Sequence, residues 1–321
     1  MAACLMCASD GLQLLYQGVR DRYGVAPGVS SFLGCQACGS ATLDQIPPPE
    51  TLATFYPPEY TFKAASDHVS PLRRLVARLE WRLFYLGTYR RRLAIVRQLT
   101  GLASGRLLEV GCGSGLFLRC LAEAGYEVEG VELSRADADY ACRRLGLRVF
   151  PGALEALALP SARYDAVILL YVLEHIPQPS RTLAEIRRIL KPGGWVVLGL
   201  PVLDSVQSRL LGARWSAVTE APRHVTIPSF EGARRLLIRS GFRAVRAAPA
   251  PLLENAGHVA LSLLPAAATP RAYAGAGLAP LLLRRMAGAV MMLPGLMVAA
   301  AERVPGGPGV RTGTMIFCGQ T

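Results

Sequence analysis

Lysine is nearly absent from this chain of 321 residues, and charged residues of all kinds make up only 18% of it. Lys63 and Lys191 are the two lysines, so arginine supplies almost all the positive charge behind the net charge of +12. Basicity of this kind can follow genome composition and does not by itself indicate a nucleic-acid partner. The first residues lack the basic segment and long apolar run of a secretory signal, which predicts a cytoplasmic location. In that compartment the eight cysteines favour metal or core roles over disulfides.

Long apolar runs are missing even where charge is scarcest. From 255 to 301 the only formal charges belong to Arg271, Arg284 and Arg285. The uncharged run 286–301 has 16 residues, fewer than the roughly 20 of a spanning helix, and a Pro-Gly pair interrupts it. The sequence therefore predicts a helical insertion at about 251–309 that does not cross a bilayer.

Four cysteines near the start form two C-x2-C pairs. Cys4 and Cys7 make the first, and Cys35 and Cys38 make the second after 27 intervening residues. Two such pairs suit tetrahedral zinc bound by four thiolates, and a complete thiolate set implies a structural ion. We therefore expect residues 1–60 to be a zinc-binding module followed by a proline-rich linker.

Short apolar runs alternate with helical patterns from residue 105 onward. The predicted strands are 106–111, 126–132, 148–150, 164–171 and 194–200, with a last one at 314–318. The predicted helices between them are 115–125, 134–145 and 180–190. This alternation predicts an α/β domain with a parallel sheet over 105–321.

A glycine-rich turn follows the first of these strands. Gly111, Gly113 and Gly115 are spaced G-x-G-x-G, whereas a dinucleotide fold would have G-x-G-x-x-G. Glycines let a ligand approach the backbone, and the following helix offers free N–H groups. Glu132 ends the next predicted strand, where a carboxylate can accept both hydroxyls of a ribose. The pairing of loop and acid predicts a nucleoside site.

Together these motifs resemble the class I S-adenosylmethionine-dependent methyltransferases. The resemblance rests on 107–115 with Glu132, on 164–177, on the LKPGG turn at 190–194 and on Gly241-Phe242, in the family's order. It covers about residues 85–250 and the last strand. It implies a Rossmann-like, seven-stranded sheet with one antiparallel strand, helices on both faces, and S-adenosylmethionine over the strand ends.

The resemblance also implies a set of cofactor-binding residues. Glu132 would hold the ribose hydroxyls, and Leu133 would lie against the adenine. Many members carry an acid where this chain has Ala153, so backbone groups or Glu155 would replace that contact. The full expected set is Glu109, Gly111, Cys112, Gly113, Gly115, Glu132, Leu133, Ala153, Leu154 and Tyr171.

Two histidines are the candidates for a general base. His175 follows the fourth predicted strand, beside the expected methyl donor, and His224 lies in the long connection after the fifth. An oxygen nucleophile needs such a base. Alternatively, His175 orients its turn and His224 caps the helix that begins near Ser229. Trp215 and Arg223 are expected to line the acceptor site.

The arginine-rich segment between module and sheet has two interpretations. Residues 71–97 contain eight arginines and one glutamate on an amphipathic helical pattern, within a linker at 61–104. In the first interpretation, this helix covers the cofactor, and the apolar insertion forms helices that cap the acceptor pocket or a dimer face. Alternatively, 71–97 and 278–301 make peripheral contact with the inner face of a membrane.

The sequence thus predicts a methyltransferase that uses S-adenosylmethionine and a structural Zn²⁺. Its acceptor is expected to be a small molecule, a saccharide or a lipid-linked intermediate. Alternatives are a protein or RNA methyltransferase, or a non-catalytic binding protein organised by zinc. The sparse basic and aromatic residues around the cysteines do not favour nucleic acid. The oligomeric state stays open.

Overall fold

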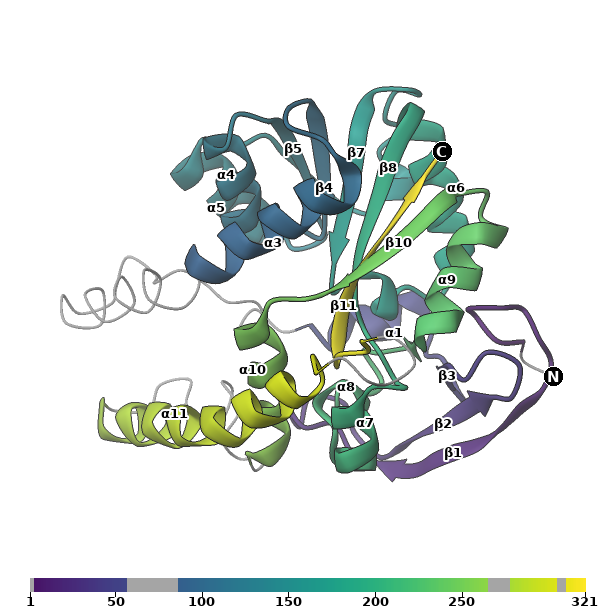
Figure 1. Cartoon of the computed structure of the whole chain (residues 1–321), viewed down its shortest axis with the longest axis vertical. Helices are drawn as coiled ribbons and strands as arrows, with labels where there is room; N and C mark the ends of the chain where they lie inside the picture. The colour runs from purple at the N-terminus through teal and green to yellow at the C-terminus, as the bar shows by residue number, and fades with distance from the viewer. Residues whose placement is uncertain (1–2, 57–85, 265–277, 305–309) are drawn as a thin grey trace.

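The computed structural model describes residues 3–56, 86–264, 278–304 and 310–321, with the backbone alone for 278–285. Its larger sheet has seven strands in the order β10-β11-β8-β7-β4-β5-β6 (Figure 1). All run parallel except β11, which is antiparallel to both neighbours. The strands are β4 (Arg106–Val110), β5 (Glu127–Glu132), β6 (Val149–Pro151), β7 (Tyr164–Leu170), β8 (Leu190–Pro201), β10 (Arg243–Pro249) and β11 (Thr314–Gln320).

Helices cover both faces of this sheet, so its central strands are almost continuously apolar. On one face α3 (Leu86–Thr100) and α4 (Leu116–Glu123) pack their leucines against β4, β7 and β8. On the other face α6 (Pro179–Ile189) and α9 (Phe230–Arg239) do the same. The helix α5 (Arg135–Leu145) shares a small apolar cluster with α4. Each helix therefore buries one apolar stripe against the sheet.

A smaller sheet joins the amino-terminal residues to the segment that follows β8. It consists of β1 (Leu12–Val19), β2 (Ser30–Cys35), β3 (Ala41–Leu43) and β9 (Thr226–Ile227), in that order. The two-residue strand β9 pairs antiparallel with β3, with Ala41 opposite Ile227. The cysteine-bearing residues and the connection after β8 thus form one sheet.

The remaining elements are short, apart from two helices in the apolar insertion. The α-helices are α1 (Pro49–Thr54), α7 (Val206–Leu211), α8 (Ser216–Thr219), α10 (Leu252–Leu263) and α11 (Leu278–Ala301). The 3-10 helices, labelled η, are η2 (Leu154–Ala156), η3 (Leu173–His175) and η4 (Gly212–Arg214). A buried polar network fixes the insertion to the sheet. The Glu302 carboxylate accepts from the backbone N–H of Gln207 at 2.9 Å and of Gly313 at 3.1 Å, and Asn255 Oδ1 accepts from Thr314 N–H at 2.7 Å.

The predicted α/β sheet with one antiparallel strand is confirmed. The strand β8 begins at Leu190, earlier than expected, because the LKPGG turn already belongs to it. Of the arginine-rich segment 71–97, the part from Leu86 is helical and the rest lies outside the described residues. Across the described ranges, no helix has the length and hydropathy needed to cross a bilayer.

Candidate functional site

The glycine turn after β4 is held by backbone geometry that only glycine adopts readily. Gly111, Gly113 and Gly115 have φ values of 69°, 53° and 79°, in the left-handed region. A Cβ at Gly111 would lie 2.4 Å from Val172 Cγ2, whereas a Cβ at Gly113 would meet no atom of the described residues within 4 Å. The described residues therefore pack closely against the turn at Gly111 and leave space beside Gly113.

The carboxylate of Glu132 closes this turn at the end of β5. Its two oxygens accept hydrogen bonds from Gly113 N–H at 2.7 Å and Ser134 N–H at 2.8 Å. The side chain is 9% exposed, and burial raises the pKa of its carboxyl group. Each carboxylate oxygen keeps a further lone pair, so a donor above Gly113 can be bound in addition.

Three polar groups lie close together where β4, β7 and α3 meet. They are the Glu109 carboxyl, the Tyr171 hydroxyl and the Arg92 guanidinium. Oxygen Oε2 of Glu109 and the hydroxyl of Tyr171 have no hydrogen-bond partner among the described residues. Burial raises the pKa of Glu109 to about 8, while the nearby Arg92 guanidinium opposes that shift. The same guanidinium lies 5.5 Å from the centre of the Tyr171 ring. Unpartnered buried oxygens are costly, which indicates space for a polar or cationic ligand beside Glu109.

The other expected cofactor residues divide into exposed and buried ones. The Leu133 side chain is 74% exposed and Ala153 is also exposed, so both are accessible to a base lying on β5 and β6. Cys112 and Leu154 place their side chains in apolar clusters. The backbone of Cys112 is bonded within the turn, because its N–H donates to the Val131 carbonyl at 3.2 Å and its carbonyl accepts from Gly115 N–H at 2.9 Å. Glu155 accepts a hydrogen bond from Thr182 Oγ1.

The two candidate bases lie side by side, although they are 49 positions apart in sequence (224 − 175). The ring centres of His175 and His224 are 4.6 Å apart. Nδ1 of His224 lies 2.7 Å from the carbonyl of Ala217, and Nδ1 of His175 lies 3.1 Å from that of Arg223. Each carbonyl accepts an Nδ1 proton, which leaves Nε2 of each ring as the unprotonated nitrogen.

Burial keeps this histidine pair neutral. It lowers the pKa of His175 and of His224 to about 3, with further repulsion from charged neighbours. The Glu174 carboxyl is 1% exposed, its Oε2 has no hydrogen-bond partner within the described part of the chain, and burial raises its pKa to about 8. Ligand atoms of Glu174, His175 and His224 lie within 4.8 Å of one another, so the cluster can accept a proton or a cation.

Sequence reasoning missed two residues of this histidine cluster. The hydroxyl of Tyr56 lies 3.0 Å from Nδ1 of His175, and Nε2 of His224 lies 3.6 Å from a carboxylate oxygen of Glu220. Glu220 lies four residues before His224, in the non-helical segment that follows α8 (Ser216–Thr219), so no helical pattern pointed to this contact. The approach of Tyr56 depends on the packing of the amino-terminal residues and had no local signal.

Two residues expected to line the acceptor site lie instead in the interior. Trp215 and Arg223 are both 0% exposed. Trp215 Nε1 donates to Gln207 Oε1 at 3.1 Å, and Arg223 forms a two-pronged ion pair with Asp21 at 2.6 and 3.1 Å. Arg223 thus fastens the amino-terminal residues to the connection. The helix beginning at Phe230 is capped by the side chain of Ser229, so His224 is not its cap.

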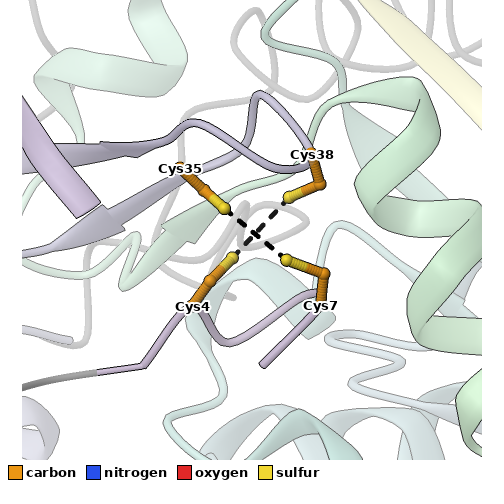
Figure 2. Close-up of side chains that lie close together, drawn as sticks. All are labelled: Cys4, Cys7, Cys35 and Cys38. Atoms are coloured by element: carbon orange, nitrogen blue, oxygen red, sulfur yellow. Dashed lines mark hydrogen bonds between the residues drawn. The ribbon is translucent and has the colours of Figure 1, made fainter. Parts of the chain in front are cut away.

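The four paired cysteines converge. Figure 2 shows their side chains pointing toward a common centre from two turns of the chain. The sulfur of Cys4 is 3.7 Å from that of Cys38, and the sulfur of Cys7 is 3.5 Å from that of Cys35. Thiolates at about 2.3 Å from a tetrahedral zinc would be about 3.8 Å apart, close to these distances. The donor set and its spacing fit zinc.

Comparison with known proteins agrees with this arrangement. A family model described as "Methyltransferase domain" matches residues 84–247, just over half of the chain. The chain belongs to this methyltransferase family. The matched range contains the glycine turn, Glu132 and both histidines, and it ends within β10, before the apolar insertion.

Curated relatives of this methyltransferase share its central part. The "Ubiquinone biosynthesis O-methyltransferase" of Methylococcus capsulatus is 35% identical over 33% of this chain and 47% of its own length. The protein of the same name from Bordetella avium is 33% identical over 45% of this chain and 54% of its own. The chain thus spans about half the length of the curated relatives it matches.

A solved structure shares the methyltransferase fold. It is Haemonchus contortus "Phospholethanolamine N-methyltransferase 2", in complex with phosphomonomethylethanolamine and S-adenosylhomocysteine. The TM-score is 0.50 at 18% identity, and the match covers 73% of this chain and 53% of that one. At this identity the likeness shows the fold alone.

Proposed function

We propose that this protein transfers a methyl group from S-adenosylmethionine to a hydroxyl of a small-molecule, saccharide or lipid-linked acceptor. The observation that supports it most is the Glu132 carboxylate, buried at the end of β5 and bonded to Gly113 N–H beside an open turn. Membership of the methyltransferase family and the naming of the curated relatives as O-methyltransferases point the same way.

Each part of the cofactor has a counterpart in this arrangement. The ribose hydroxyls would donate to Glu132. The adenine would lie on Leu133 and approach the backbone of Ala153 and Leu154. The turn 111–115 would bind the amino-acid end. The Glu109 carboxylate would face its ammonium group, which explains the unpartnered oxygen. When bound, S-adenosylmethionine supplies a methyl group on a sulfonium, and the protein contributes alignment and exclusion of water.

The histidine pair would accept the proton of the acceptor hydroxyl. Both rings are neutral at pH 7 because burial lowers the pKa of each, so a lone pair is available without prior deprotonation. His224 is the proposed base, since Ala217 fixes its tautomer and Glu220 lies 3.6 Å from Nε2, where it would stabilise the imidazolium. His175 and Tyr171 would border the reacting hydroxyl.

We also propose that Cys4, Cys7, Cys35 and Cys38 hold a structural Zn²⁺. The second pair of ligands lies next to the segment that carries His224. Ser229 Oγ donates to the carbonyl of Cys38, and Ser40 Oγ accepts from Ser229 N–H at 2.9 Å. A fixed metal site would therefore hold the start of α9 and, through β9, the position of His224.

Calorimetry with S-adenosylhomocysteine, the demethylated product, tests the cofactor assignment. We expect one binding site in the wild type and a large loss of affinity in Glu132→Ala. The matched control is Glu127→Ala, at the opposite end of β5, where the side chain is exposed and pairs with Arg106. If the wild type shows no affinity for either nucleoside, the proposed activity is wrong.

A further inference from the structure

The helix α11 has two faces of different character. Toward α10 it presents small residues, and Gly295 is in such close contact that a Cβ there would lie 2.4 Å from the carbonyl oxygen of Ala256. Ala299, one turn further along, is 0% exposed, and the buried Glu302 continues the same row. This face is fully used in packing against α10 and in the polar network with Gln207.

The opposite face of α11 carries a row of large apolar side chains without a partner in the described chain. Met286, Val290, Leu293 and Met297 are 66%, 56%, 66% and 74% exposed. Their spacing of four, three and four residues places them on one helix face, over a length of about 17 Å. We name these four residues the α11 apolar row. Exposed rows of this kind mark contact with a partner or a membrane.

The charges around the α11 apolar row match an anionic surface. No Asp or Glu occurs from 278 to 301, and Arg284 and Arg285 precede the row in sequence. At the other end of the helix, Arg303 is partly buried and donates to the carbonyls of Ala299 and Ala250. The exposed Arg91 of α3 lies near it, next to the exposed Arg90. A second copy of a chain with net charge +12 would bring like charges together, whereas anionic lipid headgroups would neutralise them.

We propose that the α11 apolar row lies in the interface of an anionic lipid bilayer. The described residues of α11 are not long and apolar enough to cross, so the helix would lie in the plane of the interface with its row among the acyl chains. Figure 1 shows α11 crossing α10 below the seven-stranded sheet, with one end extending away from the body of the molecule. Insertion of the row therefore requires no unfolding of the sheet.

This placement would bring the proposed acceptor site near the lipid surface. The helix α10, packed on α11, carries His258 on its inner side, with its ring centre 5.8 Å from that of Tyr171. Glu254 of the same helix pairs with Arg92 at 2.7 Å. One helix thus separates the α11 apolar row from residues beside the histidine pair. The membrane contact itself does not depend on the proposed methyl transfer.

Flotation of the purified full chain with lipid vesicles tests the proposal. The probes are vesicles of phosphatidylcholine with phosphatidylglycerol and vesicles of phosphatidylcholine alone. We expect the protein to float with the anionic vesicles, and less so at high salt, because screening weakens the arginine contribution. Absence of flotation with anionic vesicles would overturn the proposal.

Substitutions within the row provide the matched comparison. The double variant Leu293→Gln with Met297→Gln should lose about tenfold or more in vesicle partitioning, while its affinity for S-adenosylhomocysteine stays that of the wild type. Ile238→Gln, on the exposed side of α9 at 47% exposure, is the control and should float normally. Equal flotation of all three proteins would overturn the proposal. So would sedimentation that shows a dimer dissociated by the double variant, because a second copy would then cover the row.

Discussion

The two ends of the proposed active site are built in different ways. The cofactor end is built mainly from one strand–turn–helix–strand unit, in which the turn after β4 donates the Gly113 N–H to the Glu132 carboxylate at the end of the neighbouring parallel strand β5. The acceptor end gathers side chains from distant parts of the chain, with Tyr56, His175 and His224 meeting near η3. The first end can form within the sheet alone, whereas the second needs the smaller sheet to be in place.

This difference suggests that the two ends can be disturbed separately. The cofactor end depends on φ angles and strand order, which the buried core of the larger sheet maintains. The acceptor end depends on β9, on the ion pair between Arg223 and Asp21, and on the contact of Ser229 with Cys38. Changes in the amino-terminal residues should therefore alter catalysis without altering cofactor affinity.

The largest expected effect follows from removing the proposed zinc. In Cys38→Ser we expect bound zinc to be lost and methyl transfer to become undetectable, since structural zinc sites contribute on the order of 10 kcal/mol. Affinity for S-adenosylhomocysteine should persist. Mass spectrometry measures the zinc content, and calorimetry measures the affinity for S-adenosylhomocysteine. The control is Cys142→Ser, which lies outside the group of four paired cysteines. A parallel loss of cofactor affinity would contradict the separation of the two ends.

Replacing the proposed base should affect the acceptor end alone. We expect His224→Gln to lower kcat by about 10²–10⁴-fold, the usual range for general base catalysis, at unchanged cofactor affinity. The control is His258→Gln, whose Nδ1 lies 3.2 Å from Ser216 Oγ and which has no assigned proton transfer. Steady-state kinetics decides, and a wild-type kcat in His224→Gln would exclude this residue as the base.

Two glycines of the turn should respond differently to alanine. Gly111→Ala brings a Cβ against Val172 and should destabilise the fold by about 2–4 kcal/mol, from backbone strain and overpacking together. Gly113→Ala has free space and should cost about 1 kcal/mol of stability. It should nevertheless weaken S-adenosylhomocysteine binding, because the methyl group occupies the open side of the turn. Thermal unfolding measures the stability of both variants, and calorimetry measures their affinity for S-adenosylhomocysteine. Unchanged affinity in Gly113→Ala would show that the ligand does not bind beside Gly113.

The smallest predicted effect is a pH dependence of cofactor affinity. Burial raises the pKa of Glu109 to about 8, so the carboxyl is mostly protonated at pH 6 and 7. Binding of an ammonium group favours the ionised form, and affinity should therefore rise up to about tenfold from pH 6 to pH 7. In Glu109→Gln this dependence should vanish. Calorimetry in buffers of different ionisation enthalpy would also detect the released proton, and a flat wild-type profile would argue against the contact.

The fold, and the placement of the glycine turn beside Glu132, could be predicted from the sequence because both rest on local patterns, and the binding of a cofactor there stays a prediction. Strand periodicity, the spacing of Gly111, Gly113 and Gly115, and the position of Glu132 all lie within one strand–turn–helix–strand unit. The acceptor end was predicted only in part. The two histidines were named, but their mutual contact and the approach of Tyr56 depend on tertiary packing. The burial of Trp215 and Arg223 was missed because large amphipathic side chains suit both an open pocket and a satisfied interior.

The two-residue strand β9 has a consequence for how such an enzyme could be altered. It makes the cysteine-bearing residues structural neighbours of the connection that we propose faces the acceptor, while the proposed nucleoside site belongs to the larger sheet. A chimera that exchanged the first 56 residues together with 203–229 would therefore be expected to inherit a new acceptor preference and to retain the original methyl donor. Donor choice and acceptor choice are in this sense separable traits of one polypeptide.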